Sequence, residues 1–189
     1  MREGRMGLAV VAVLGATAGG VAGCSSEAPP AATFPRPVPV RTTYPAAAAG
    51  GVCQLLDYAV IRKILGAQFD LAAASRSGAT RTCVVQAGGV SRPDLSLSVT
   101  KTTADARIYR KEVVPDGSTT VKGLGQAAYQ MPMAPVKGAG AGIEVGWLSK
   151  DGRIMTLCYT LAAGKGTTTA AKSLPKLVAL AKAVDAVHA

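Results

Sequence analysis

Residues 142–162 read GIEVGWLSKDGRIMTLCYTLA, and this stretch decides the fold. Two β-rich runs, 142–149 and 153–162, flank Lys150-Asp151-Gly152, and an Asp-Gly pair between such runs is typical of a type I′ hairpin turn. That turn would place six side chains on one face of the hairpin: Ile143, Val145, Trp147, Ile154, Thr156 and Cys158. The stretch therefore predicts an antiparallel β-hairpin.

Further strands are expected upstream of this hairpin, at residues 69–71, 81–86, 95–100 and 127–131. The clearest alternation is that of Leu95, Leu97 and Val99 with Ser96 and Ser98, which predicts that the serines lie on the solvent face. A turn at Ser91-Arg92-Pro93-Asp94 would join two of these strands.

A short helix is predicted at residues 58–65, where start and stop residues agree. Asp57 suits the N-cap, and Leu56 and Ile61 are placed to form a hydrophobic staple. Gly66 supplies the left-handed residue after the last turn.

Two more helices complete the expected fold. One should run from a Thr103 cap through Glu112, and the other should begin near Ser173 because Pro175 is best tolerated in a first turn. The last helix carries an apolar stripe for packing onto the sheet: Leu177, Leu180, Ala181, Val184 and Val187. The order of elements predicts an α+β fold, an antiparallel sheet of five to six strands packed against two or three helices.

The N-terminus has the features of an export leader. Arg2 and Arg5 precede an apolar run at residues 6–22, and Val21-Ala22-Gly23-Cys24 follows the pattern of a lipobox. In bacterial lipoproteins with this motif the chain is cut between the residues at the positions of Gly23 and Cys24, and the Cys thiol receives a diacylglycerol. The alternative, an uncleaved signal anchor, is disfavoured by the abrupt polar turn at Ser25-Ser26-Glu27.

The chain accordingly divides into a signal peptide at 1–23, a lipidated Cys with a Pro/Ala-rich tether at 24–52, and a globular domain at 53–189. Proline favours extended polyproline II in the tether. Removing 23 of the 189 residues leaves 166, and losing Arg2, Arg5 and Glu3 lowers the formal charge from +10 to +9. The expected location is the extracytoplasmic face of the cell membrane.

The residue inventory argues against catalysis, cofactors and metals. His188 is the only histidine, there is no Cys-x-x-Cys pair, and no catalytic serine motif or paired carboxylates stand out. Gly164-Lys165-Gly166-Thr167 lacks the spacing of a phosphate-binding loop, and the glycines of residues 138–142 lack that of a dinucleotide fingerprint. Both are interpreted as turns.

Three cysteines remain for the domain: Cys53, Cys83 and Cys158. An exported protein meets an oxidising environment, so a disulfide is expected, and three pairings are possible. We favour Cys53–Cys83, which would join the start of the first helix to a strand. Cys158 is then expected to be a buried apolar thiol on the face of Trp147.

Several short motifs resemble those of small actinobacterial lipoproteins that carry the domain of unknown function 3558. They are Cys53-Gln54-Leu55-Leu56-Asp57, Ile64-Leu65-Gly66, Cys83 on a strand, and Gly123-Leu124-Gly125-Gln126-Ala127-Ala128. The resemblance implies a lipid-anchored α/β domain with its first two cysteines paired and no established catalytic residue. Val84 and Gln126 depart from the Trp and Asp common in that family. A PsbP-like lipoprotein fold, also a helix-covered antiparallel sheet, is a related possibility.

The excess of basic residues raises the question of an acidic partner. Arg107, Arg110 and Lys111 fall on one face of the second helix, and further cations lie at Lys150, Arg153, Lys172, Lys176 and Lys182. Few aromatic residues are present for stacking, and the compartment is wrong for nucleic acid. Anionic envelope polymers or lipid headgroups are the natural partners, unless the charge only keeps the domain soluble.

The leading functional hypothesis is a non-catalytic envelope lipoprotein that binds or scaffolds a component where membrane meets wall, anchored in membrane lipid through Cys24. The first alternative is a carrier of an apolar ligand in a sheet–helix cleft lined by Trp147, Tyr159 and Leu177. The second is an envelope hydrolase with a site that the sequence does not reveal.

Overall fold

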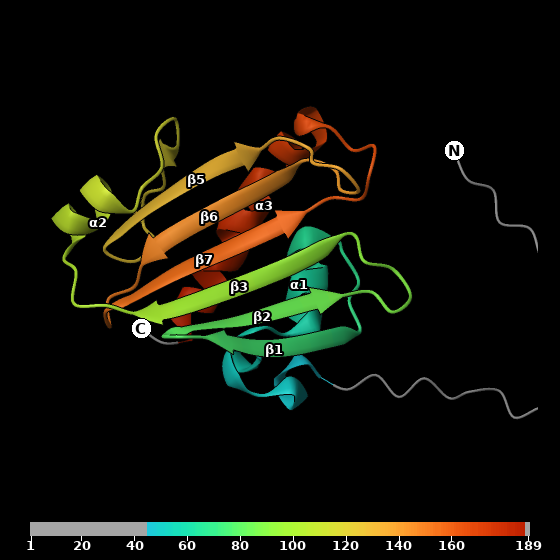
Figure 1. The fold of residues 1–189 in the computed structure, drawn as a ribbon, viewed down its shortest axis with the longest axis horizontal. Coiled ribbons are helices and arrows are strands. Elements are labelled where there is room, and N and C mark those ends of the chain that lie inside the picture. Colours follow the sequence, from blue (N-terminus) through green and yellow to red (C-terminus); the bar gives the residue numbers. More distant parts are fainter. Residues whose placement is uncertain (1–44, 188–189) are drawn as a thin grey trace, which may run out of the picture. The chain divides into compact units, whose positions relative to one another are not determined.

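The computed structural model describes residues 45–187, which fold around a seven-stranded antiparallel sheet (Figure 1). The strands lie in the order β1-β2-β3-β7-β6-β5-β4. Their bounds are β1 (Leu71–Ser77), β2 (Thr80–Gln86), β3 (Asp94–Lys101), β4 (Thr119–Thr120), β5 (Ala127–Met133), β6 (Gly142–Leu148) and β7 (Arg153–Thr160). The predicted α+β fold is confirmed, with one strand more than the five to six expected.

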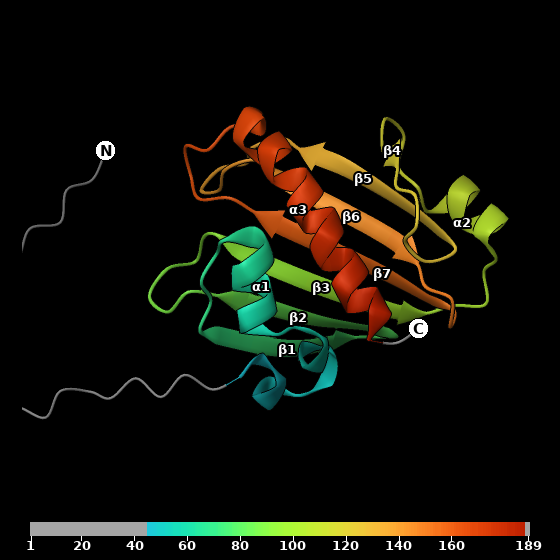
Figure 2. The same ribbon diagram turned by 180° about the vertical axis from the view of Figure 1, so that it is seen from behind.

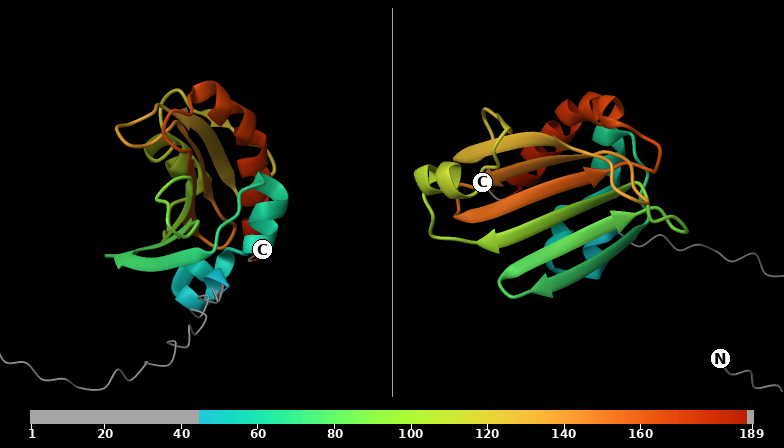
Figure 3. Two further views of the ribbon diagram at one scale, coloured as in Figure 1. Left: turned by 90° about the vertical axis from the view of Figure 1, so that its right-hand side faces the viewer. Right: turned by 45° about the horizontal axis from the view of Figure 1, so that its top comes forward.

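Two helices cover one face of this sheet, and a third, shorter helix lies on the other face. α1 (Tyr58–Leu65) and α3 (Thr167–Ala186) lie across one face, where α3 crosses the central strands (Figure 2). The short α2 (Ala106–Glu112) lies on the opposite side, at the β5 end of the sheet (Figure 3). The rest of that second face, here called the open face, carries no helix of the described chain.

The hydrophobic core lies between the sheet and α1 and α3. Its largest fully buried side chains include Trp147, Ile61, Leu97, Leu157, Leu177 and Leu180. The strand residues among them alternate with the small polar residues of the open face, as a sheet with one covered face requires.

The central hairpin has a register one residue away from the predicted one. Ser149 pairs with Arg153, so Lys150, Asp151 and Gly152 form a three-residue loop, with Gly152 at φ +75°. A three-residue loop that ends in a left-handed glycine replaces the expected two-residue type I′ turn. Trp147 therefore lies opposite Met155, and the prediction that Ile154, Thr156 and Cys158 share its face was wrong.

α1 matches its predicted bounds from Tyr58 to Leu65. The Asp57 side chain accepts hydrogen bonds from the backbone N–H groups of Ala59 (2.6 Å) and Val60 (3.1 Å), and Gly66 ends the helix at φ +75°. α2 begins later than expected, because Asp105 rather than Thr103 accepts the capping bond from Ile108 N–H.

α3 begins at Thr167, six residues before the expected start, and it contains Pro175. Within the extra turns Ala170 is fully buried against the core, and this contact favours the longer helix although Pro175 removes a backbone hydrogen bond. Leu177, Leu180, Ala181 and Val184 form the predicted apolar stripe, whereas Val187 lies past the helix end and is exposed.

Packed structure begins before the predicted domain start at residue 53. The 3₁₀ helices η1 (Ala46–Ala49) and η2 (Gly51–Leu55) lie against β1 and β2, and Ala46 and Val52 are buried. Residues 46–52, which fall within the range predicted as the tether, are thus packed against the sheet. The strand predicted at residues 69–71 is in fact β1, which runs from Leu71 to Ser77. Its sequence LAAASRS has few large apolar residues that would indicate a strand.

Candidate functional site

The open face is lined by short hydroxyl side chains. The register brings together Ser75, Ser77, Thr80, Thr82, Ser96, Ser98, Thr100, Thr156 and Thr160. Two pairs are bonded across strands, Thr80 with Thr100 (2.8 Å) and Thr82 with Ser98 (3.0 Å). The predicted solvent-face positions of Ser96 and Ser98 are confirmed.

Charge is distributed unevenly around the sheet. Among the strand positions on the open face there is no lysine or arginine, although the chain carries a formal charge of +10. The acidic residues of this face are Asp94 and Glu144. The cations of the described residues therefore lie on helices, on loops and on strand positions of the other face, such as Arg81 and Arg153.

A buried polar cluster lies where α2 covers the open face. The Tyr129 hydroxyl donates a 2.6 Å hydrogen bond to Oε1 of Glu144, and the Tyr109 ring from α2 packs 6.4 Å from that of Tyr129. Burial, followed by the nearby Glu144 carboxylate, raises the pKa of both tyrosines. Within the described residues the buried Tyr109 hydroxyl has no hydrogen-bond partner.

Cys158 lies beside this cluster, opposite Ser96 and Glu144, and not on the Trp147 face where it was expected. It is a free, half-buried cysteine. Burial is the main cause that raises the pKa of its thiol to about 11. At neutral pH the group is therefore a protonated thiol, a poor nucleophile.

Asp94 is the second acidic group of the open face. It forms an ion pair of 2.9 Å with Arg92, yet burial outweighs that cation and raises the pKa of the carboxyl group.

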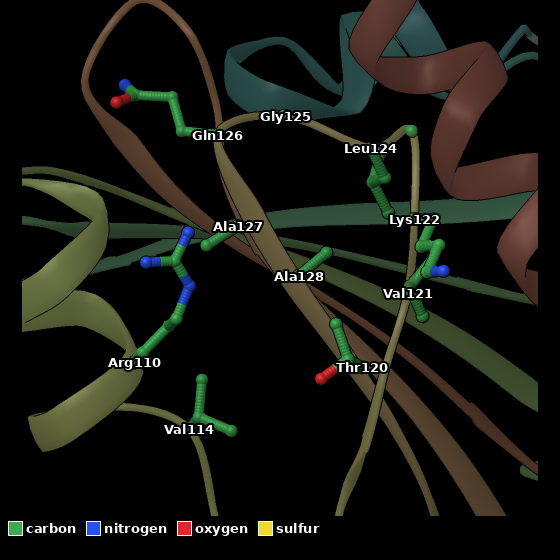
Figure 4. Close-up of a pocket in the computed structure, with 11 residues that line it drawn as sticks. Arg110, Val114, Thr120, Val121, Lys122, Leu124, Gly125, Gln126, Ala127 and Ala128 are labelled. Carbon is green, nitrogen blue, oxygen red and sulfur yellow. The ribbon is translucent and has the colours of Figure 1, made fainter.

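A pocket of about 420 Å³ lies between α2 and the loop that leads into β5 (Figure 4). Its lining consists of Arg110, Val114, Thr120, Val121, Lys122, Gly123, Leu124, Gly125, Gln126, Ala127 and Ala128. We call it the basic pocket, because Arg110 and Lys122 are its charged residues and no carboxylate lines it. Figure 4 shows these two side chains on opposite sides of Ala127 and Ala128, with the Gln126 side chain turned away.

The loop of the basic pocket is held firmly by the rest of the domain. Gln126 donates from its backbone N–H to Leu148 (2.7 Å) and from its side-chain amide to the Ser149 carbonyl (2.9 Å). Gly125 N–H donates to Asp185 of α3 at 3.3 Å. Gly125 stands at φ +54°, and a Cβ there would lie 2.2 Å from the Leu148 carbonyl oxygen, so only glycine fits.

The sequence-predicted site residues have separate places in the structure. Cys53 and Cys83 form the favoured disulfide, fully buried, with Cα atoms 5.0 Å apart. Gly23 and Cys24, with the rest of the predicted signal peptide and residues 24–44 of the tether, lie outside the described residues.

The expected basic face of α2 is divided. Arg110 lines the basic pocket, whereas Lys111 forms a 3.0 Å ion pair with its neighbour Glu112. Sequence reasoning did not identify the cluster around Glu144 or the role of Asp185. Alternation in β6 was the one available signal for Glu144, because it interrupts an apolar run.

The residues assigned to a carrier cleft lie in the packed core. Trp147 and Leu177 are fully buried and Tyr159 nearly so, and none of these three lines the basic pocket or the pockets beside β1, α1 and the β6–β7 loop. A carrier site at this position would require the sheet–helix packing to open.

The two glycine-rich stretches that imitate nucleotide motifs have packing and turn roles. A Cβ at Gly140 would lie 2.2 Å from the Ala162 carbonyl oxygen, and Gly166 is the N-cap of α3. Within residues 45–187 no group of three or more His, Cys, Asp or Glu side chains is placed to hold a metal ion. The same residues include no helix of sufficient length and apolarity to cross a membrane.

Comparisons with known proteins add little to this geometry. No protein-family model matches the chain, and no curated protein matches it, so the resemblance to the domain-3558 lipoproteins stays a prediction. One solved structure, of a protein from Bacteroides thetaiotaomicron VPI-5482, aligns with 56% of this chain at 16% identity and a TM-score of 0.33. The chain covers 40% of that structure, and similarity at this level carries no argument.

Proposed function

We propose that this chain is a lipid-anchored lipoprotein of the cell envelope, held in the membrane through acylated Cys24, whose domain binds or scaffolds an envelope component without catalysis. The observation that carries the proposal is the buried Cys53–Cys83 disulfide downstream of a leader that ends in Val21-Ala22-Gly23-Cys24. A disulfide of this kind belongs to proteins that fold in an oxidising compartment, which agrees with export.

The distance between anchor and domain follows from the observed domain start. Packed structure begins at Ala46, so the segment 24–44 separates the acylated residue from the domain. At about 3.1 Å per residue, a proline-rich stretch of this length spans at most roughly 65 Å. The domain would therefore work close to the membrane surface, within reach of both headgroups and the inner wall.

The protonation and the hydrogen-bond partners of the polar groups favour a binding role over a catalytic one. The Cys158 thiol is protonated at neutral pH, the Tyr129 hydroxyl is bonded to Glu144, and Asp94 is paired with Arg92. No group in this set is arranged as a nucleophile beside a base. Residues available for a ligand include hydroxyls of the open face and the two cations of the basic pocket.

The test is metabolic labelling of the full chain in an actinobacterial host with an alkyne-bearing fatty acid. The proposal predicts fluorescent labelling of the wild-type chain after dye coupling, and no labelling of Cys24→Ala. Cys158→Ala is the matched control, because it removes a cysteine outside the lipobox and should be labelled as strongly as wild type. An unlabelled wild-type chain in the membrane fraction would contradict the lipid anchor.

A further inference from the structure

The basic pocket holds two cations that form no ion pair within the described residues. Arg110 and Lys122 make no ion pair with any described residue. The nearby carboxylates are already engaged, since Asp105 caps α2 (2.7 Å to Ile108 N–H) and Asp185 binds Trp147 (2.9 Å) and Gly125. The Arg110 charge is among the causes that lower the pKa of Asp105, after the capping bond from Ile108 N–H, but no carboxylate lines the pocket itself, so positive charge predominates there.

A third cation stands beside the same loop. The Lys182 ammonium group of α3 lies 3.6 Å from the position that a Cβ on Gly123 would occupy. Lysines and arginine from three separate parts of the chain thus meet at one loop: α2, the loop itself and the last turns of α3. The loop already contacts one carboxylate, Asp185, through Gly125 N–H, and the three converging cations favour a further anion.

The loop also offers backbone hydrogen-bond donors. Within the described residues, no group accepts a hydrogen bond from the N–H groups of Lys122, Gly123 and Leu124. Their neighbours Val121, Gly125 and Gln126 all have partners. Successive free N–H groups together with lysine and arginine side chains are what phosphate groups bind in proteins.

We propose that the basic pocket binds the phosphate group of an anionic envelope component. Arg110 would contact the phosphate oxygens with its guanidinium group, Lys122 with its ammonium group, and the free N–H groups of the loop would complete the binding. The pocket is also lined by apolar side chains, among them Val114, Val121 and Leu124, which would suit a short glycerol-like group beside the phosphate. A volume of about 420 Å³ is within the range of small-ligand sites.

This assignment rests on the proposed envelope location only for the source of the phosphate, which could be a phospholipid headgroup or a phosphate-bearing wall polymer. The chemistry of the pocket does not depend on the anchor. The binding test therefore uses the full chain with Cys24→Ser, which removes the acylation point and changes no described residue. Failure of the pocket and failure of the lipid anchor then give separate results.

The first measurement is a titration of this chain with glycerol 3-phosphate, followed by the amide signals in nitrogen–proton NMR spectra. Shifts confined to residues 120–128 and the C-terminal end of α2 are expected. The double variant Arg110→Gln with Lys122→Gln should bind at least about tenfold more weakly, since two charge-assisted contacts are lost. Lys172→Gln with Lys176→Gln removes the same charge from an exposed part of α3 and should stay within about twofold of wild type.

Vesicle sedimentation distinguishes the two sources. Binding to equimolar phosphatidylcholine and phosphatidylglycerol vesicles that exceeds binding to soluble glycerol phosphate polymer would assign the pocket to headgroups, and the reverse order would assign it to the wall polymer. Two results would overturn the proposal: no shift in the loop amides, or equal weakening by both double variants.

Discussion

The indole Nε1–H of Trp147 donates a 2.9 Å hydrogen bond to Oδ1 of Asp185, joining the middle of the sheet to the last turn of α3. The other carboxylate oxygen, Oδ2, accepts from Gly125 N–H at 3.3 Å. One side chain thus fixes the position of the core tryptophan, the C-terminal helix and the loop of the basic pocket together.

Replacement of Asp185 by alanine should destabilise the domain by about 1–3 kcal/mol, because the fully buried Trp147 keeps an N–H group without an acceptor. Asp185→Asn is the matched variant, since its side-chain oxygen can still accept from Trp147, and it should retain most of the stability. Urea unfolding followed by Trp147 fluorescence measures both. Equal stability of Asp185→Ala and wild type would show that this bond contributes nothing.

Loss of the disulfide should have a larger effect. Cys53→Ser with Cys83→Ser opens a covalent loop with a sequence separation of 30, and we expect a cost of about 3–4 kcal/mol. Adding reductant to the wild-type chain should lower its melting temperature by as much as the double substitution does. Cys158→Ser should leave the melting temperature nearly unchanged. An absence of any response to reductant would contradict a structural role for the bond.

The half-buried Cys158 should react slowly with iodoacetamide. Because burial raises the pKa of its thiol to about 11, about one molecule in a thousand carries a thiolate at pH 8. The alkylation rate should therefore rise about tenfold per pH unit up to pH 11, well beyond the range of an ordinary cysteine. A rate that levels off near pH 9, measured by mass spectrometry, would contradict the raised pKa.

The same shift has a consequence for stability at alkaline pH. The folded chain holds the Cys158 proton more tightly than the unfolded chain, so this contribution is fully present below the ordinary pKa near 9 and is lost as pH rises toward 11. Tyr109 and Tyr129, whose pKa values are also raised, act in the same direction at higher pH.

Gly125→Ala should be among the more damaging single substitutions in the loop. The added Cβ would meet the Leu148 carbonyl oxygen at 2.2 Å and would also occupy a left-handed conformation. We expect a loss above about 2 kcal/mol. Gly164→Ala is the control, because Gly164 has φ +81° but open space around it, and its cost should be about 1–2 kcal/mol. Equal costs for the two variants would contradict the close contact with Leu148.

Local signals in the sequence were sufficient for the elements whose ends carry capping residues. Asp57 and Gly66 set the bounds of α1 because each satisfies backbone groups within the helix itself. The hairpin at residues 142–162 was also recognisable, but its register depends on whether Ser149 pairs with Arg153, a choice made by the loop conformation. The one-residue difference moved Cys158 to the other face of the sheet.

Features that depend on tertiary packing could not be predicted from local patterns. Nothing in the local sequence indicates that Ala46 and Ala170 are buried, yet both are covered by elements distant along the chain. The basic pocket has the same origin, since Arg110 and the loop 120–128 meet only through the packing of α2 on β5. The Gly123–Ala128 motif was recognisable in the sequence, whereas the hydrogen bond from Gly125 N–H to Asp185 was not.

The intact mass of the chain recovered from the membrane fraction tests the lipid anchor most directly. We expect a species that begins at Cys24, carries a diacylglyceryl group on that cysteine and is two hydrogens lighter than its reduced form because of the Cys53–Cys83 disulfide. A chain that retains residues 1–23, or that begins at Cys24 without an acyl group, would contradict the account.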